Sequence, residues 1–73
     1  MSRLISQVNK DIDKTNNSNS KIRLRNFTTE LENLKNTNQL SKNSLAIEQA
    51  KYEVLKAELA LEEARDAKST VRL

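Results

Sequence analysis

The chain has 73 residues and a formal net charge of +3, and it contains neither cysteine nor histidine. These absences exclude disulfides, thiolate and imidazole catalysis, and zinc sites of the usual Cys/His kind. A chain of this length forms one small domain at most, and a single core of that size is marginal without crosslinks or partners. We therefore expect association with other chains to supplement the core.

Glycine and proline, which normally mark turns and strand ends, are also absent. We predict an all-α fold, with a short N-terminal helix followed by an antiparallel helical hairpin, in a coiled-coil-like bundle completed by oligomerisation or by a partner. No apolar run is long enough to span a bilayer, and no signal peptide is recognisable. We expect an intracellular protein, which could form part of a larger assembly.

The first segment combines a short amphipathic pattern with a polar run. Apolar residues recur at helical spacings of three and four, at Leu4, Ile5, Val8 and Ile12. This spacing predicts a short helix over residues 2–14. The polar run TNNSNS over residues 15–20 competes with the backbone for hydrogen bonds and predicts a break. We therefore treat residues 1–19 as a short helix with a polar linker, followed by a hairpin over residues 20–73.

The second segment, residues 20–36, carries an a/d seam over two heptads, formed by Leu24, Phe27, Leu31 and Leu34. We predict that this seam is the core of the hairpin. The stretch KIRLR at the start of the segment alternates charged and apolar residues, as a strand would. The sequence ELENLK downstream is strongly helical, so we favour a helix and keep a strand as the alternative.

The third segment, predicted to be helical over residues 44–70 with Ser44 as its N-cap, follows a polar break at residues 36–43. It has two apolar stripes. The first, called the Ile47 stripe, consists of Ile47, Ala50, Val54, Ala57, Leu61 and Ala64. The second, called the Tyr52 stripe, consists of Leu45, Tyr52, Leu55 and Leu59. At about 100° per residue the two stripes lie nearly opposite each other on a helix.

A helix with two opposed apolar stripes needs two neighbours. We expect one stripe to pack on the Leu24 to Leu34 seam of the same chain and the other on another molecule. In the Ile47 stripe larger residues alternate with alanine, which would let a partner helix approach closely, so we predict that it is a protein-interaction surface. The alternative is that its alanines reflect helix propensity alone. Our first functional hypothesis is a structural, assembly or regulatory subunit that binds a protein partner or itself.

Positive charge is concentrated in the N-terminal part of the chain. Residues 1–43 contain eight Lys and Arg against four Asp and Glu, whereas residues 44–73 contain five against six. The cluster of Lys21, Arg23 and Arg25 could contact phosphates, so our second hypothesis is a small basic nucleic-acid-binding protein. We favour the first hypothesis because no aromatic stacking platform accompanies the cluster.

Candidate catalytic groups are sparse. The acidic residues occur as adjacent or alternate pairs, whose members point apart on a helix, and no base accompanies them. We therefore expect no enzymatic activity, no cofactor, no metal site and no small-molecule substrate. The content of asparagine and lysine is typical of an AT-rich genome, such as many phages have, and suggests a viral origin.

Overall fold

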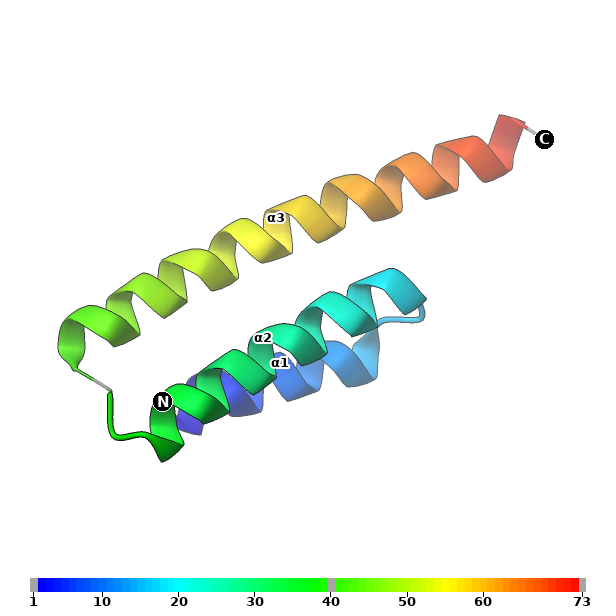
Figure 1. Ribbon diagram of the computed structural model, residues 1–73. Coiled ribbons are helices and arrows are strands. Elements are labelled where there is room, and N and C mark those ends of the chain that lie inside the picture. Colours follow the sequence, from blue (N-terminus) through cyan, green and yellow to red (C-terminus); the bar gives the residue numbers. More distant parts are fainter. Residues whose placement is uncertain (1, 40, 73) are drawn as a thin grey trace.

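The computed structural model describes residues 2–39 and 41–72, with side chains up to residue 66. The described residues form three α-helices: α1 (Ser2–Lys14), α2 (Ser18–Asn36) and α3 (Lys42–Arg72) (Figure 1). None of these residues lies in a strand, and KIRLR is part of α2. The all-α prediction is confirmed.

Two of the helices begin earlier than the sequence predicted, because a polar residue upstream caps each of them. The Asn17 side chain accepts a hydrogen bond from the backbone N–H of Ser20 at 3.0 Å, so α2 begins at Ser18 and not at residue 20. Ser41 Oγ accepts one from the N–H of Ser44 at 3.1 Å, so α3 begins at Lys42. A polar run predicts a break, but several of its residues can act as the cap.

The C-terminal end of α2 shows how this chain turns without glycine. Asn38 adopts a left-handed conformation with φ of 55°. The N–H of Asn38 donates to the carbonyl of Lys35 at 3.3 Å, and the N–H of Gln39 donates to that of Leu34 at 3.2 Å. This is the Schellman pattern of helix ends, in which asparagine is the common substitute for glycine.

The core lies between the three helices, and α1 and α2 approach each other more closely than either approaches α3. Its buried residues are Leu4, Val8, Leu24, Phe27, Leu31, Tyr52 and Leu59. Partly buried apolar residues pack around them, namely Ile5, Ile12, Leu45 and Leu55. Leu34 of the predicted hairpin seam is half-buried. Because α1 supplies Leu4 and Val8, it shares one core with α2 and α3.

Helices α2 and α3 run in opposite directions (Figure 1). Ser20 contacts Glu63, and further along the pair the Phe27 and Tyr52 rings stack with centroids 6.1 Å apart and planes inclined by 4°. The molecule is elongated, with extents of 49 × 19 × 15 Å. Helix α3 is the longest element and extends beyond the turn between α1 and α2 at its C-terminal end (Figure 1).

Candidate functional site

The Ile47 stripe lies on the side of α3 opposite the core. Its three large residues, Ile47, Val54 and Leu61, are 56%, 57% and 60% exposed, and its alanines are exposed as well. The Tyr52 stripe faces the other two helices: Tyr52 and Leu59 are buried, and Leu45 and Leu55 are half-buried. The fold therefore buries one apolar face of α3 and leaves the other uncovered by the described residues.

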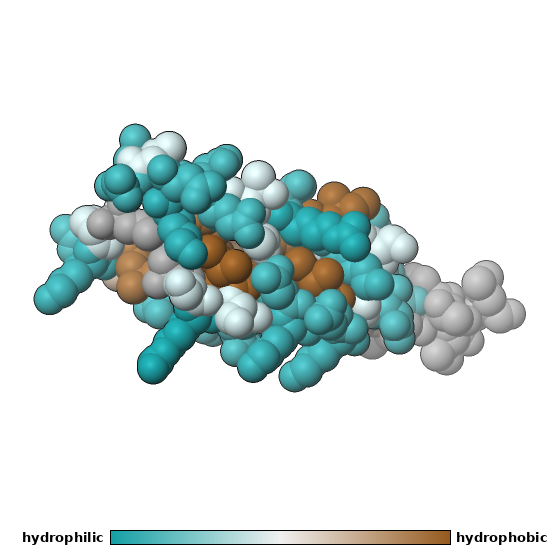
Figure 2. Space-filling model, turned by 90° about the horizontal axis from the view of Figure 1, so that it is seen from below, coloured by the Kyte–Doolittle hydropathy of each residue, from teal (hydrophilic) through white to brown (hydrophobic). Residues whose placement is uncertain are grey.

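The exposed large residues of the stripe follow one line along α3. They recur every seven residues, so the line from Ile47 to Leu61 covers four helical turns and about 21 Å. Isolated exposed aliphatic residues are common on protein surfaces, but a continuous apolar line marks a contact surface. On the face seen from below, where α1 and α2 lie in Figure 1, hydrophilic residues cover most of the surface and hydrophobic residues show mainly in its middle (Figure 2).

The three basic residues of the predicted phosphate cluster do not act as one group. Lys21 and Arg25 are four positions apart and share one side of α2, whereas Arg23 points to α3. The Arg23 guanidinium forms ion pairs with Glu58 and Glu62, both at 2.7 Å. These carboxylates, first of all the hydrogen bond to Glu58, raise the pKa of Arg23. The charge of Arg23 is thus engaged within the chain.

A buried carboxyl group lies between α2 and α3. Glu48 is only 4% exposed, and among the described residues no donor reaches its buried Oε2 atom. Its Oε1 atom lies 3.4 Å from Lys51 Nζ, which also contacts Glu30 at 3.2 Å. Burial, and then hydrogen bonding to Glu30, raises the pKa of Glu48. Hydrogen bonding to Glu48 lowers the pKa of Glu30, so the pKa values of the two carboxyl groups are shifted in opposite directions.

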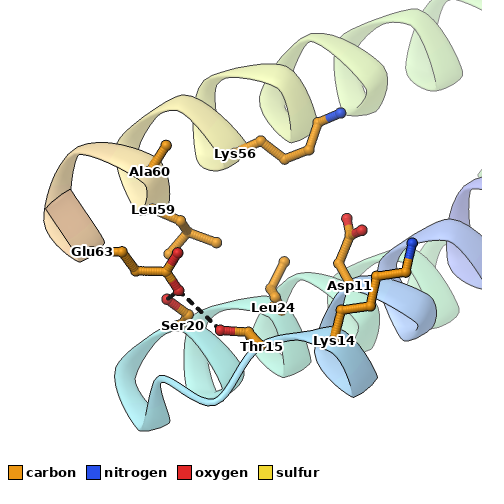
Figure 3. A pocket seen from close by; sticks show the side chains of 9 residues that line it. All are labelled: Asp11, Lys14, Thr15, Ser20, Leu24, Lys56, Leu59, Ala60 and Glu63. Carbon is orange, nitrogen blue, oxygen red and sulfur yellow. Dashed lines mark hydrogen bonds between the residues drawn. The ribbon is translucent and has the colours of Figure 1, made fainter. Parts of the chain in front are cut away.

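A groove of about 320 Å³ lies where the three helices meet (Figure 3). Leu24 and Leu59 line its apolar part, and the charged side chains at its edge come from α1 and α3. The Glu63 carboxylate accepts hydrogen bonds from Thr15 Oγ1 at 2.9 Å and from Ser20 Oγ at 3.0 Å. These polar groups bind one another across the helices, so we assign the groove a structural role.

Tyr52 connects the core to α1 and to the surface of α3. Its hydroxyl donates a hydrogen bond to Asp11 of α1. Burial and then this hydrogen bond raise the pKa of Tyr52 to about 12. On α3 itself, Lys56 Nζ lies 4.5 Å from the centre of the Tyr52 ring, a cation–π contact. Tyr52 therefore belongs to the fold.

The polar linker has a role that the sequence analysis did not identify. Besides capping α2, Asn17 donates from Nδ2 to Asp66 of α3 at 3.3 Å, and Thr15 and Ser20 both donate to Glu63. The linker thus fastens the turn between α1 and α2 to α3. The preference of asparagine and serine for helix caps was a usable signal, but their partners on α3 are more than 40 residues away in sequence.

We compared the chain with protein-family models, with curated proteins and with solved structures, and none of the three comparisons returned a match. Across the residues that the structure describes, no helix combines the length and the apolar character needed to cross a membrane. In the same part of the chain, no three acidic side chains gather in a way that could hold a metal ion.

Proposed function

We propose that this protein is a non-enzymatic helical interaction protein, a structural, assembly or regulatory subunit that binds another helix through the Ile47 stripe. The observation that carries the proposal is the exposure of Ile47, Val54 and Leu61 on a face of α3 that the chain's own core does not use. Covering these side chains would remove apolar surface from water, which is the main driving force of helix association.

The proposed partner is a protein, either a second copy of the chain or a different helical protein, and it would complete a coiled-coil-like bundle around α3. Helix α3 is well suited to this role because the Tyr52 stripe, the Arg23 ion pairs and the linker contacts hold its other face. A partner would therefore meet a helix that is already ordered, which lowers the entropic cost of binding.

Nucleic-acid binding is the weaker candidate. Of the three basic residues considered for phosphate contact, Arg23 already lies between Glu58 and Glu62. Phosphates would have to compete with these two carboxylates, and their own contacts would be sensitive to salt.

The proposal is tested by placing a charge in the middle of the stripe. In Ala57→Glu, an exposed alanine becomes a carboxylate that a partner helix would have to bury. We expect binding or self-association to weaken by about tenfold or more, since burying an unpaired carboxylate costs more than the roughly 1.4 kcal/mol that a factor of ten represents. Asn26→Glu adds the same charge at an exposed position of α2 and is the matched control.

Two measurements decide the outcome. Sedimentation and light scattering over a concentration series report self-association of the unaltered chain and of both variants, and circular dichroism confirms that each variant keeps its helices. A photo-crosslinking amino acid at Val54, compared with one at Asn26, reports a different partner in cells that make the protein. A monomer at every concentration, together with no adduct specific to position 54, would refute the proposed function.

A further inference from the structure

We propose that the Ile47 stripe binds the same stripe of a second copy of the chain, with the two α3 helices antiparallel. This inference rests on the proposed function and specifies its partner and geometry. In the proposed register, Ile47 lies opposite Ala64 of the second copy, Val54 opposite Ala57, and Leu61 opposite Ala50. The contact is two-fold symmetric, so each of these pairs occurs twice.

The order of side-chain sizes along the stripe supports the antiparallel direction. Large and small residues alternate from one end to the other, and all six are exposed. Reversing the stripe about its midpoint, between Val54 and Ala57, places a small residue opposite every large one. Each layer then has nearly the same volume, so the two helices can approach closely along the whole contact without gaps.

A parallel pair would pack less evenly. In that arrangement each large residue lies opposite the same residue of the second copy, and each alanine lies opposite an alanine. The layers with two large residues would hold the helices apart, and the alanine layers between them would leave cavities. A different helix as the partner would not require the stripe to be complementary to itself, so this property of the sequence specifically favours a second copy.

The charges beside the stripe favour the same arrangement. Lys51 and Glu58 lie on one flank, one heptad apart, and their side chains are 53% and 51% exposed. In the antiparallel register, Glu58 of the second copy lies two positions, about 3 Å along the axis, from the point opposite Lys51. Each Lys51 can therefore pair with a Glu58 of the other copy, and this happens on both sides of the two-fold axis.

The existing ion pairs are compatible with these new contacts. Glu58 is paired with Arg23, and Lys51 with Glu30 and Glu48, so the dimer would carry a row of alternating charges across the two copies. In a parallel pair, by contrast, Glu53 on the other flank would meet Glu58 of the second copy, which places two like charges together. Charge complementarity of this kind selects the orientation of a pair more than its strength.

The test uses single cysteines in a chain that has none of its own. Ile47→Cys and Ala64→Cys are purified separately, checked for unchanged helicity by circular dichroism, and oxidised alone and as an equimolar mixture. We expect a disulfide-linked dimer as the main product of the mixture only. In either variant alone, the two cysteines of an antiparallel dimer would be roughly 25 Å apart, far beyond the reach of a disulfide.

A second pair of variants, Ala50→Cys and Leu61→Cys, tests the same register if either cysteine of the first pair disturbs the fold. Crosslinking of Ile47→Cys with itself would show a parallel dimer; this would overturn the inference and leave the proposed function standing. A monomeric unaltered chain, with no disulfide in either mixture, would also overturn the inference. In that case the photo-crosslinking at Val54 decides separately whether a different protein occupies the stripe.

Discussion

Glu48→Gln should stabilise the protein at neutral pH. Glu48 is 4% exposed, and its Oε2 atom has no donor among the described residues, so its ionised form is poorly solvated. Glutamine has the same shape, carries no charge and can donate a hydrogen bond to Glu30. An unsatisfied buried polar group costs about 1–3 kcal/mol, and more when it is charged. We expect the free energy of unfolding to rise by about 1–3 kcal/mol.

The pH dependence follows from the directions of two pKa shifts. Because the pKa of Glu48 is raised in the folded state, its contribution is fully present below its ordinary value of 4.5 and is lost as the pH rises through the raised pKa. Glu30 behaves oppositely: its lowered pKa makes its contribution present above 4.5 and lost as the pH falls through the lowered pKa. The pair therefore favours the folded state most near pH 4.5. Glu48→Gln should remove the decrease in folding stability that occurs as the pH rises above 4.5.

The assay is urea unfolding followed by circular dichroism, at neutral pH and below pH 4.5. With a slope of about 1 kcal/mol per molar urea, as for small domains, the midpoint at neutral pH should rise by about 1–3 M. Below pH 4.5 Glu48 is protonated and therefore uncharged, like the glutamine that replaces it, so the two proteins should unfold at similar urea concentrations. Glu32→Gln removes the same charge from an exposed position of α2 and should change the stability by less than about 0.5 kcal/mol. Equal or lower stability of Glu48→Gln at neutral pH would refute the reasoning.

Three further outcomes follow from the core, the turn and the buried tyrosine. Leu31→Ala, at a fully buried position, should cost about 2–5 kcal/mol in chemical unfolding, whereas Ile22→Ala, at a 55% exposed position, should cost less than about 1 kcal/mol. Asn38→Gly should raise the free energy of unfolding by up to about 1 kcal/mol, because glycine adopts the left-handed conformation without strain; a lower free energy of unfolding would contradict the assigned turn. Near-ultraviolet absorbance should show Tyr52 ionising near pH 12, with the folded state losing stability as the pH rises from 10.0 through that value. Asp11→Asn should move this ionisation toward 10.0, and an unmoved titration would argue against the hydrogen bond.

The sequence predicted the helix break and the capping residues of the linker, but it did not predict the contacts of the linker with α3. The polar run between α1 and α2 predicted a break, and its asparagines and serines are the residues that cap helices. That Asn17 also binds Asp66, and that Thr15 and Ser20 bind Glu63, depends on where α3 passes. These contacts join positions more than 40 residues apart, so no local sequence pattern predicts them.

The sequence by itself determined the all-α class and which residues share a face of each helix, because helix propensity and the 3.6-residue period are local properties. The two stripes of α3 were therefore predictable as sets. Only the tertiary structure decided which stripe is buried, because burial depends on what the neighbouring helices offer. The space beside Phe27 is filled by the Tyr52 ring, which also reaches Asp11, whereas the alanines of the Ile47 stripe would have left that space empty.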